Sequence, residues 1–146
     1  MDINQIKELR GETGGVSDAT RKARDDFRFV LSQSNFVTPN YLDYQSMVKS
    51  GVTIGYALAV PFNVEEKQCT VPGNLVKKDD PKMFVAVVCY QGGKPVNLLM
   101  FNSAVFAKAK KPVKFNKKTN QYVLQIKDIK HDSIQKYAFG HVIGSL

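Results

Sequence analysis

The strongest constraint on the fold is a hairpin signal between residues 83 and 101. An apolar run, 83–90, is followed by the polar turn Gln91-Gly92-Gly93-Lys94 and by a second β-rich run, 95–101. Two adjacent glycines supply the positive φ angles that a tight reversal needs, so the two runs are predicted to pair as antiparallel strands. Both runs are apolar enough to be anchored in a core.

Alternation predicts further strands. In residues 52–60 large side chains alternate with small ones, so one face is expected to fill a core while the other lets a neighbour approach closely. That neighbour is expected to be a helix of this chain, with a neighbouring subunit as the alternative, and Pro61 is expected to end the strand. Further strands are expected at residues 67–71, from Val113 onward, at 121–127 and at 134–143.

Helical signals come earlier in the chain. Residues 2–10 carry apolar side chains at every third position, which predicts a short amphipathic helix that the glycine-rich linker 11–15 ends. Ser17 is a good N-cap for a second helix over residues 18–32. Residues 41–47 carry tyrosines at helical spacing, which suggests one further helical turn.

This order of elements predicts an α+β fold. Residues 1–50 form an N-terminal helical segment, and residues 51–146 form a mainly antiparallel β-domain, either an OB-like small barrel or a sandwich, with the helices packed on one side or end.

Positive charge is concentrated in the second half of the chain. Residues 1–80 carry 10 Lys and Arg against 11 Asp and Glu, whereas residues 81–146 carry 11 lysines and only two acids, which together give the net charge of +8. No acid occurs between Pro81 and Lys127. Lysine is a hydrated point charge that suits phosphate groups but reads guanine edges poorly, so a nucleic-acid partner would be bound through its backbone with little sequence selectivity.

Aromatic residues interleaved with these lysines suggest single-stranded nucleic acid as the partner, because lysines can follow the phosphates while exposed rings stack on bases. Most of the aromatic rings are expected in the core, with Phe115 and then Tyr90 as the best candidates for exposure. The predicted binding residues are Lys108, Lys110, Lys111, Lys114, Phe115, Lys117, Lys118, Tyr90 and Lys94.

The alternative interpretation is a structural subunit of a multi-copy assembly, such as a virus or phage particle. Short helices ahead of a β-domain can reach a neighbour, and the lysine-rich segment can meet an acidic protein surface or packaged nucleic acid. Under this interpretation the protein is a homo-oligomer or a member of a larger assembly, with no membrane partner. Its location would then be the virion rather than the cytoplasm.

Catalytic and metal chemistry have little support in the sequence. Cys69 and Cys89 lie in apolar runs and are expected to be buried free thiols, with a disulfide as the alternative. His131 is expected in a polar turn and His141 in the core, and their spacing fits no structural zinc pattern. We expect no catalytic residue, metal or cofactor. The first residues lack the layout of a secretory signal, which favours a cytoplasmic protein.

Overall fold

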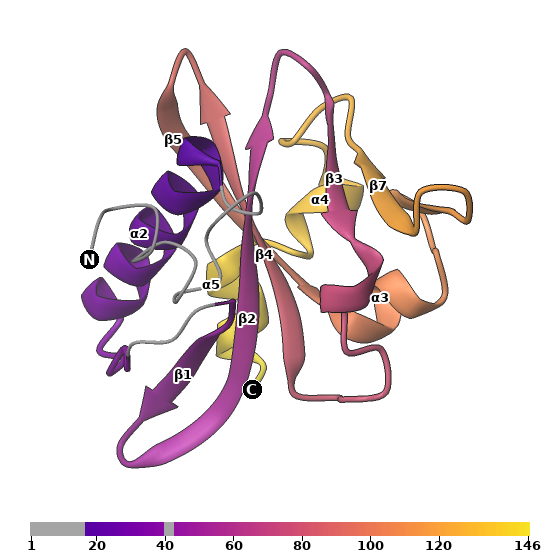
Figure 1. Ribbon diagram of the computed structural model, residues 1–146. Coiled ribbons are helices and arrows are strands. Elements are labelled where there is room, and N and C mark those ends of the chain that lie inside the picture. Colours follow the sequence, from indigo (N-terminus) through magenta and orange to yellow (C-terminus); the bar gives the residue numbers. More distant parts are fainter. Residues whose placement is uncertain (1–16, 40–42) are drawn as a thin grey trace, which may run out of the picture.

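The computed structural model describes residues 17–39 and 43–146, which form a mixed α+β fold with two sheets (Figure 1). The sequence predictions for residues 2–10 and 11–15 lie outside these residues. In chain order the elements are α2 (Asp18–Gln33), β1 (Gln45–Lys49), β2 (Val52–Asn63), β3 (Gln68–Pro72), the 3₁₀ turn η1 (Gly73–Leu75), β4 (Met83–Gln91), β5 (Lys94–Asn102), α3 (Ser103–Ala107), β6 (Val113–Asn116), β7 (Gln121–Gln125), α4 (Asp132–Gln135) and α5 (Phe139–Gly144).

The strands form a four-stranded sheet of order β1-β2-β4-β5 and a three-stranded sheet of order β3-β7-β6. The predicted hairpin is confirmed as β4 and β5, with Gly92 and Gly93 at φ 58° and 78°. The predicted strands at 67–71 and 121–127 correspond to β3 and β7, which pair antiparallel. The described strands are assigned to these two separate sheets, and no closed barrel is formed among them.

Two apolar cores lie on opposite faces of the four-stranded sheet. On one face, Ala57 and Ala59 of β2 pack in the cluster that contains Phe27 of α2. On the other face, Leu58 and other large side chains pack against the three-stranded sheet. Because both faces are covered, β4 is buried along almost its whole length. The face of β2 that carries the small side chains is therefore covered by a helix of the same chain, as the alternation of large and small residues predicts.

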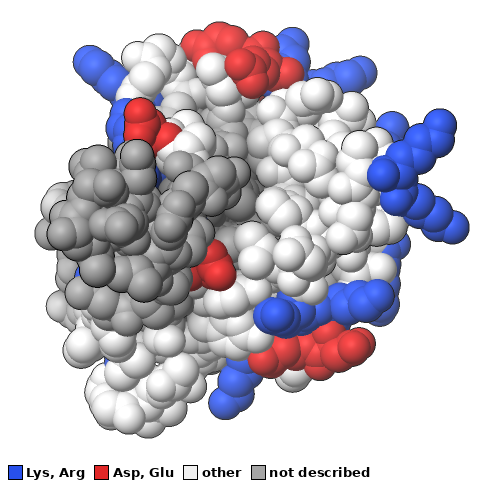
Figure 2. Space-filling view, in the orientation of Figure 1, with Lys and Arg blue, Asp and Glu red and all other residues white. Residues whose placement is uncertain are grey.

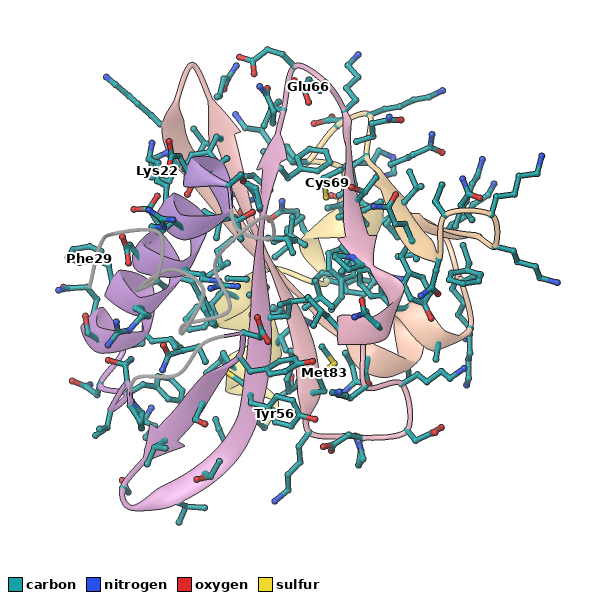
Figure 3. The ribbon with its side chains drawn as sticks, in the orientation of Figure 1. Lys22, Phe29, Tyr56, Glu66, Cys69 and Met83 are labelled. Carbon is teal, nitrogen blue, oxygen red and sulfur yellow. The ribbon has the colours of Figure 1, made fainter. Side chains whose placement is uncertain are left out.

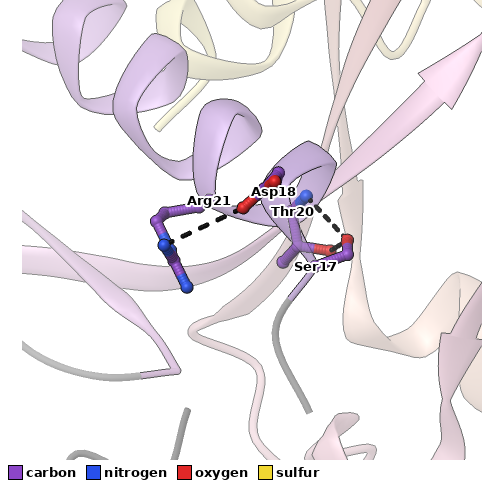
Figure 4. Close-up of polar contacts among 4 residues, drawn as sticks. All are labelled: Ser17, Asp18, Thr20 and Arg21. Carbon is purple, nitrogen blue, oxygen red and sulfur yellow. Dashed lines mark hydrogen bonds and ion pairs between the residues drawn. The ribbon is translucent and has the colours of Figure 1, made fainter. Parts of the chain in front are cut away.

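Helix α2 begins where its sequence predicts. The Ser17 side chain accepts a hydrogen bond from the main-chain N–H of Thr20 at 3.1 Å, which satisfies one of the free donors of the first turn (Figure 4). Asp18 and Arg21 form an exposed ion pair at 3.9 Å, and such a pair contributes little to stability. Burial of Ala23, Phe27 and Leu31 then fixes the helix on the sheet.

Four of the five pairs among the described strands are antiparallel, as the mainly antiparallel prediction requires. The exception lies at the centre of the four-stranded sheet, where β2 and β4 pair in parallel. Pro61 also lies inside β2 rather than at its end. The main-chain N–H groups of Tyr56 and Val64 donate toward β4. Backbone polar groups of alternate residues point to the same edge of a strand, so the backbone nitrogen of Pro61 faces the edge of β2 away from β4. β1 pairs with β2 only as far as Ala57, so a residue without an N–H forfeits no ladder bond there.

The helical turn predicted at 41–47 is wrong for the described part of that segment, since β1 begins at Gln45. Gln45 and Met47 are buried while their neighbours are half-buried, and this period of two overrides the helical spacing of the tyrosines. Residues 41 and 42 lie outside the described chain.

The last predicted strand, 134–143, is also wrong. The segment forms two short helices, α4 and α5, and its only bridge to a described strand joins Ala138 to Leu99. His141 is exposed on α5 rather than buried in the core. The alternation of residues 134–143 is imperfect. Phe139, Val142 and Ile143 instead share a helical face that packs in the apolar cluster containing Phe27 of α2. Helices therefore also follow Gly51, contrary to the prediction.

Candidate nucleic-acid interface

The β6–β7 hairpin holds the central part of the predicted lysine cluster. Its register pairs Lys114 with Val123 and Phe115 with Tyr122, and the residues that join the two strands include Lys117 and Lys118. The three lysines are exposed. In Figure 2 basic side chains project into solvent on the side where Figure 1 shows this hairpin, and no acidic surface lies beside them in that view.

Phe115 is the exposed aromatic residue of this hairpin. Its side chain is 40% exposed, whereas that of its cross-strand partner Tyr122 is 7% exposed. The two ring centroids lie 4.8 Å apart, so Tyr122 supports one side of the Phe115 ring from within the core. A ring held in this way keeps a free surface on which a base could stack without ordering a mobile side chain.

A shallow hollow of about 380 Å³ adjoins Phe115. Its lining combines lysine side chains with neutral amides and one aliphatic residue: Lys114, Phe115, Asn116, Lys117, Lys118, Val123 and Gln125. Asn116, Val123 and Gln125 were not among the residues predicted from sequence. The alternation of β7 carries their signal, because Tyr122 and Leu124 on the buried face leave Val123 and Gln125 on the outer face.

The remaining lysines of the cluster lie before the hairpin. Lys108 caps the C-terminus of α3, and Lys110 and Lys111 belong to the connection that leads into β6. The main-chain carbonyl of Lys110 accepts from Val113 N at 2.7 Å, which fixes this connection against the start of β6. All three side chains are exposed.

Tyr90 and Lys94 lie elsewhere. Both belong to the β4–β5 hairpin of the other sheet, whose tip Figure 1 shows on a different side of the molecule from β6–β7. Tyr90 is only 9% exposed, its hydroxyl donates to Asp26 Oδ2 at 2.6 Å, and Lys22 Nζ lies 4.8 Å from its ring centroid. The structure therefore contradicts the prediction of an exposed Tyr90 ring, because α2 covers it.

A larger cavity, of about 870 Å³, opens between β2 and β3 beside the start of α2. Figure 3 shows Glu66 at the turn that joins these two strands, Cys69 on β3 and Lys22 on α2. Lys22 is already engaged with Gly93 O at 2.5 Å, and Arg24 pairs with Asp43 at 3.6 Å. The cavity therefore offers few free charges to a phosphate group.

The two cysteines are free thiols, with Cys89 buried and Cys69 half-buried. Burial raises the pKa of each to about 12, so both carry their proton at neutral pH and are poor nucleophiles in that form. Within residues 17–39 and 43–146, no three His, Cys, Asp or Glu side chains gather into a group that could hold a metal ion. No helix of that part of the chain is long and apolar enough to cross a membrane.

Comparison of the chain with protein-family models, with curated proteins and with solved structures gave no match.

Proposed function

We propose that this protein binds single-stranded nucleic acid, without enzymatic activity and with little sequence preference, through the β6–β7 hairpin. The observation that carries the proposal is the exposed Phe115 ring beside Lys114, Lys117 and Lys118 on a hairpin that contains no acid. Lysines neutralise the phosphate backbone, and an exposed ring stacks on a base of any identity. An OB-like fold for this β-domain also remains a prediction.

The proposal is tested with the triple variant Lys114→Gln, Lys117→Gln, Lys118→Gln. Three fewer phosphate contacts should weaken binding of a labelled oligothymidylate at least about tenfold at low salt, and should flatten the slope of log affinity against log salt by about 2. The measurement is fluorescence anisotropy across a salt series, with circular dichroism as the check on folding.

A matched control removes three exposed lysines elsewhere, at Lys78, Lys82 and Lys94. This variant has the same net charge as the test variant, so it should keep the parent's slope if the hairpin is the site. Equal affinity and equal slope for the parent and the hairpin variant would contradict the proposal.

A second candidate, the assembly subunit, is favoured by the open strand edges at the β2–β3 cavity. The N–H and C=O of Ala59 and the C=O of Pro61 point away from β4, and no described strand pairs with β2 there. Such an edge can accept a strand from a neighbouring subunit. This candidate predicts that mass in solution rises with concentration in the absence of oligonucleotide, and that the triple lysine variant leaves this rise unchanged.

A further inference from the structure

The outer face of the three-stranded sheet extends the hairpin surface across β7 to β3. The register places Thr70, Val123 and Lys114 side by side in one row, and Gln68 beside Gln125 in the next. On the opposite face Val71, Tyr122 and Leu124 are buried in the core, and Phe115, which pairs with Tyr122, lies at the exposed edge of that face. The first row therefore faces solvent. None of the outward-facing residues of these three strands is acidic: Gln68, Thr70, Pro72, Lys114, Asn116, Gln121, Val123 and Gln125.

A second group of lysines meets at the end of this sheet farthest from the hairpin turn. Ile126 N donates to Lys67 O at 2.9 Å, and Lys127 follows Ile126 directly. On the other side of β7, Gln125 N donates to Pro112 O at 3.0 Å, and Lys111 precedes Pro112. The main chain therefore brings Lys67 and Lys111 to the two sides of Ile126, which Lys127 follows, and all three lysine side chains are exposed.

We propose that a single nucleic-acid strand crosses this outer face, from Lys117 and Lys118 at the hairpin turn to Lys67, Lys111 and Lys127 at the opposite end. This inference rests on the proposed function and extends its site to β3. The six residue-to-residue steps from Gln121 to Lys127 span about 20 Å at about 3.3 Å per step. That length matches about six nucleotides at the stacked spacing of about 3.4 Å, and fewer if the strand is extended.

The middle of this path suits any base sequence. Val123 presents an aliphatic surface, and Thr70 and Gln125 present neutral groups that both donate and accept hydrogen bonds. Gln125 Nε2 lies 3.4 Å from Gln68 Oε1, so the two amides orient each other across the strands. None of these side chains has a guanidinium group, the planar charged group with which arginine donates two hydrogen bonds to guanine.

Two acids stand beside the far lysines, since Glu66 precedes Lys67 and Asp128 follows Lys127. This end of the path is therefore less positive than the hairpin turn. The expected order of binding follows from this difference: short strands bind at the turn, and longer strands gain affinity by reaching Lys67 and Lys127.

The test compares the parent with the double variant Lys67→Gln, Lys127→Gln on oligothymidylates of four and eight nucleotides. Loss of two phosphate contacts should weaken eight-nucleotide binding about 10- to 60-fold at 50 mM salt and flatten its salt slope by about 1.4. Binding of the four-nucleotide strand should stay close to that of the parent. The control Lys78→Gln, Lys94→Gln removes equal charge and should behave as the parent with both lengths.

The outcomes separate the two proposals. If the parent binds the eight-nucleotide strand and the Lys67, Lys127 variant matches its affinity and slope, the extended path is wrong while the hairpin site stands. If the hairpin variant loses binding and the Lys67, Lys127 variant loses only the gain with length, both are supported. If the parent binds neither strand, the proposed function fails and the extended path fails with it.

Discussion

At the scale of single residues, Phe115 and Tyr90 show why one aromatic ring is available to a partner and the other is not. Both lie in hairpins with lysine in or near the turn. Tyr90 faces α2, where Asp26 accepts a hydrogen bond from its hydroxyl and Lys22 lies over its ring. Phe115 contacts Tyr122 but keeps 40% of its surface exposed. Tyr90 ends the apolar run of the central strand β4, whereas Phe115 lies between Lys114 and Asn116 on the edge strand β6. The position of the strand and the cover from α2 together distinguish the two rings.

The variant Phe115→Ala should weaken oligonucleotide binding by about 1–3 kcal/mol, because one base loses its stacking surface. The slope of log affinity against log salt should not change, since stacking releases few ions. Anisotropy titrations at two or more salt concentrations measure both quantities. Phe115→Tyr is the control and should bind as the parent does, because it keeps the ring; an alanine variant that binds as tightly as the parent would exclude stacking at this position.

At the scale of elements, α2 is held on the four-stranded sheet by buried apolar residues and by the contact between Tyr90 and Asp26. The hydroxyl also has a raised pKa, first because of burial and then because it donates to Asp26. The contact joins the helix to the β4–β5 hairpin and has no part in the β6–β7 surface.

The variant Tyr90→Phe should therefore lower the free energy of unfolding by about 1–2 kcal/mol, since it removes a hydrogen bond to a charged group that is partly buried. Urea unfolding measures this change. Oligonucleotide affinity should stay at the parent's value, and a loss of affinity in a folded Tyr90→Phe protein would show that this hairpin takes part in binding.

The sequence predicts the elements whose side chains follow one clear period. β2, β4, β5 and β7 were expected close to where they occur, because their alternation or unbroken apolar character reports burial directly. Segments with mixed periods were predicted wrongly, as at β1 and at α4 and α5. For short segments a few residues at helical or strand spacing are weak signals, and tertiary packing decides between them.

At the scale of the whole molecule, strand pairing is what the sequence could not supply. Periodicity assigns a side chain to a face but does not say which strand lies next to which, so the parallel pairing of β2 with β4 was not predicted. The same limit applies to the candidate site. The lysine cluster is visible in the sequence, whereas Lys67 comes beside Ile126 only through the pairing of β3 with β7, so its proposed part in the site could not be predicted.

The two sheets differ in how much of their surface is buried. The four-stranded sheet is covered on both faces, by α2 and α5 on one side and by the three-stranded sheet on the other. Within residues 17–39 and 43–146, the three-stranded sheet buries its inner face and leaves its outer face exposed. Exposed lysines stand at both ends of that face, and the proposed phosphate contacts would come from them.

The central claim is that nucleic acid binds the three-stranded sheet. It is tested most directly by NMR, by mapping the changes in backbone amide chemical shift when an eight-nucleotide oligothymidylate is added. The account predicts saturable shifts in residues 114–118 and 121–127, with smaller changes around α2. Shifts concentrated along the β2–β3 cavity and α2, or no shifts at an oligonucleotide concentration well above that of the protein, would contradict it.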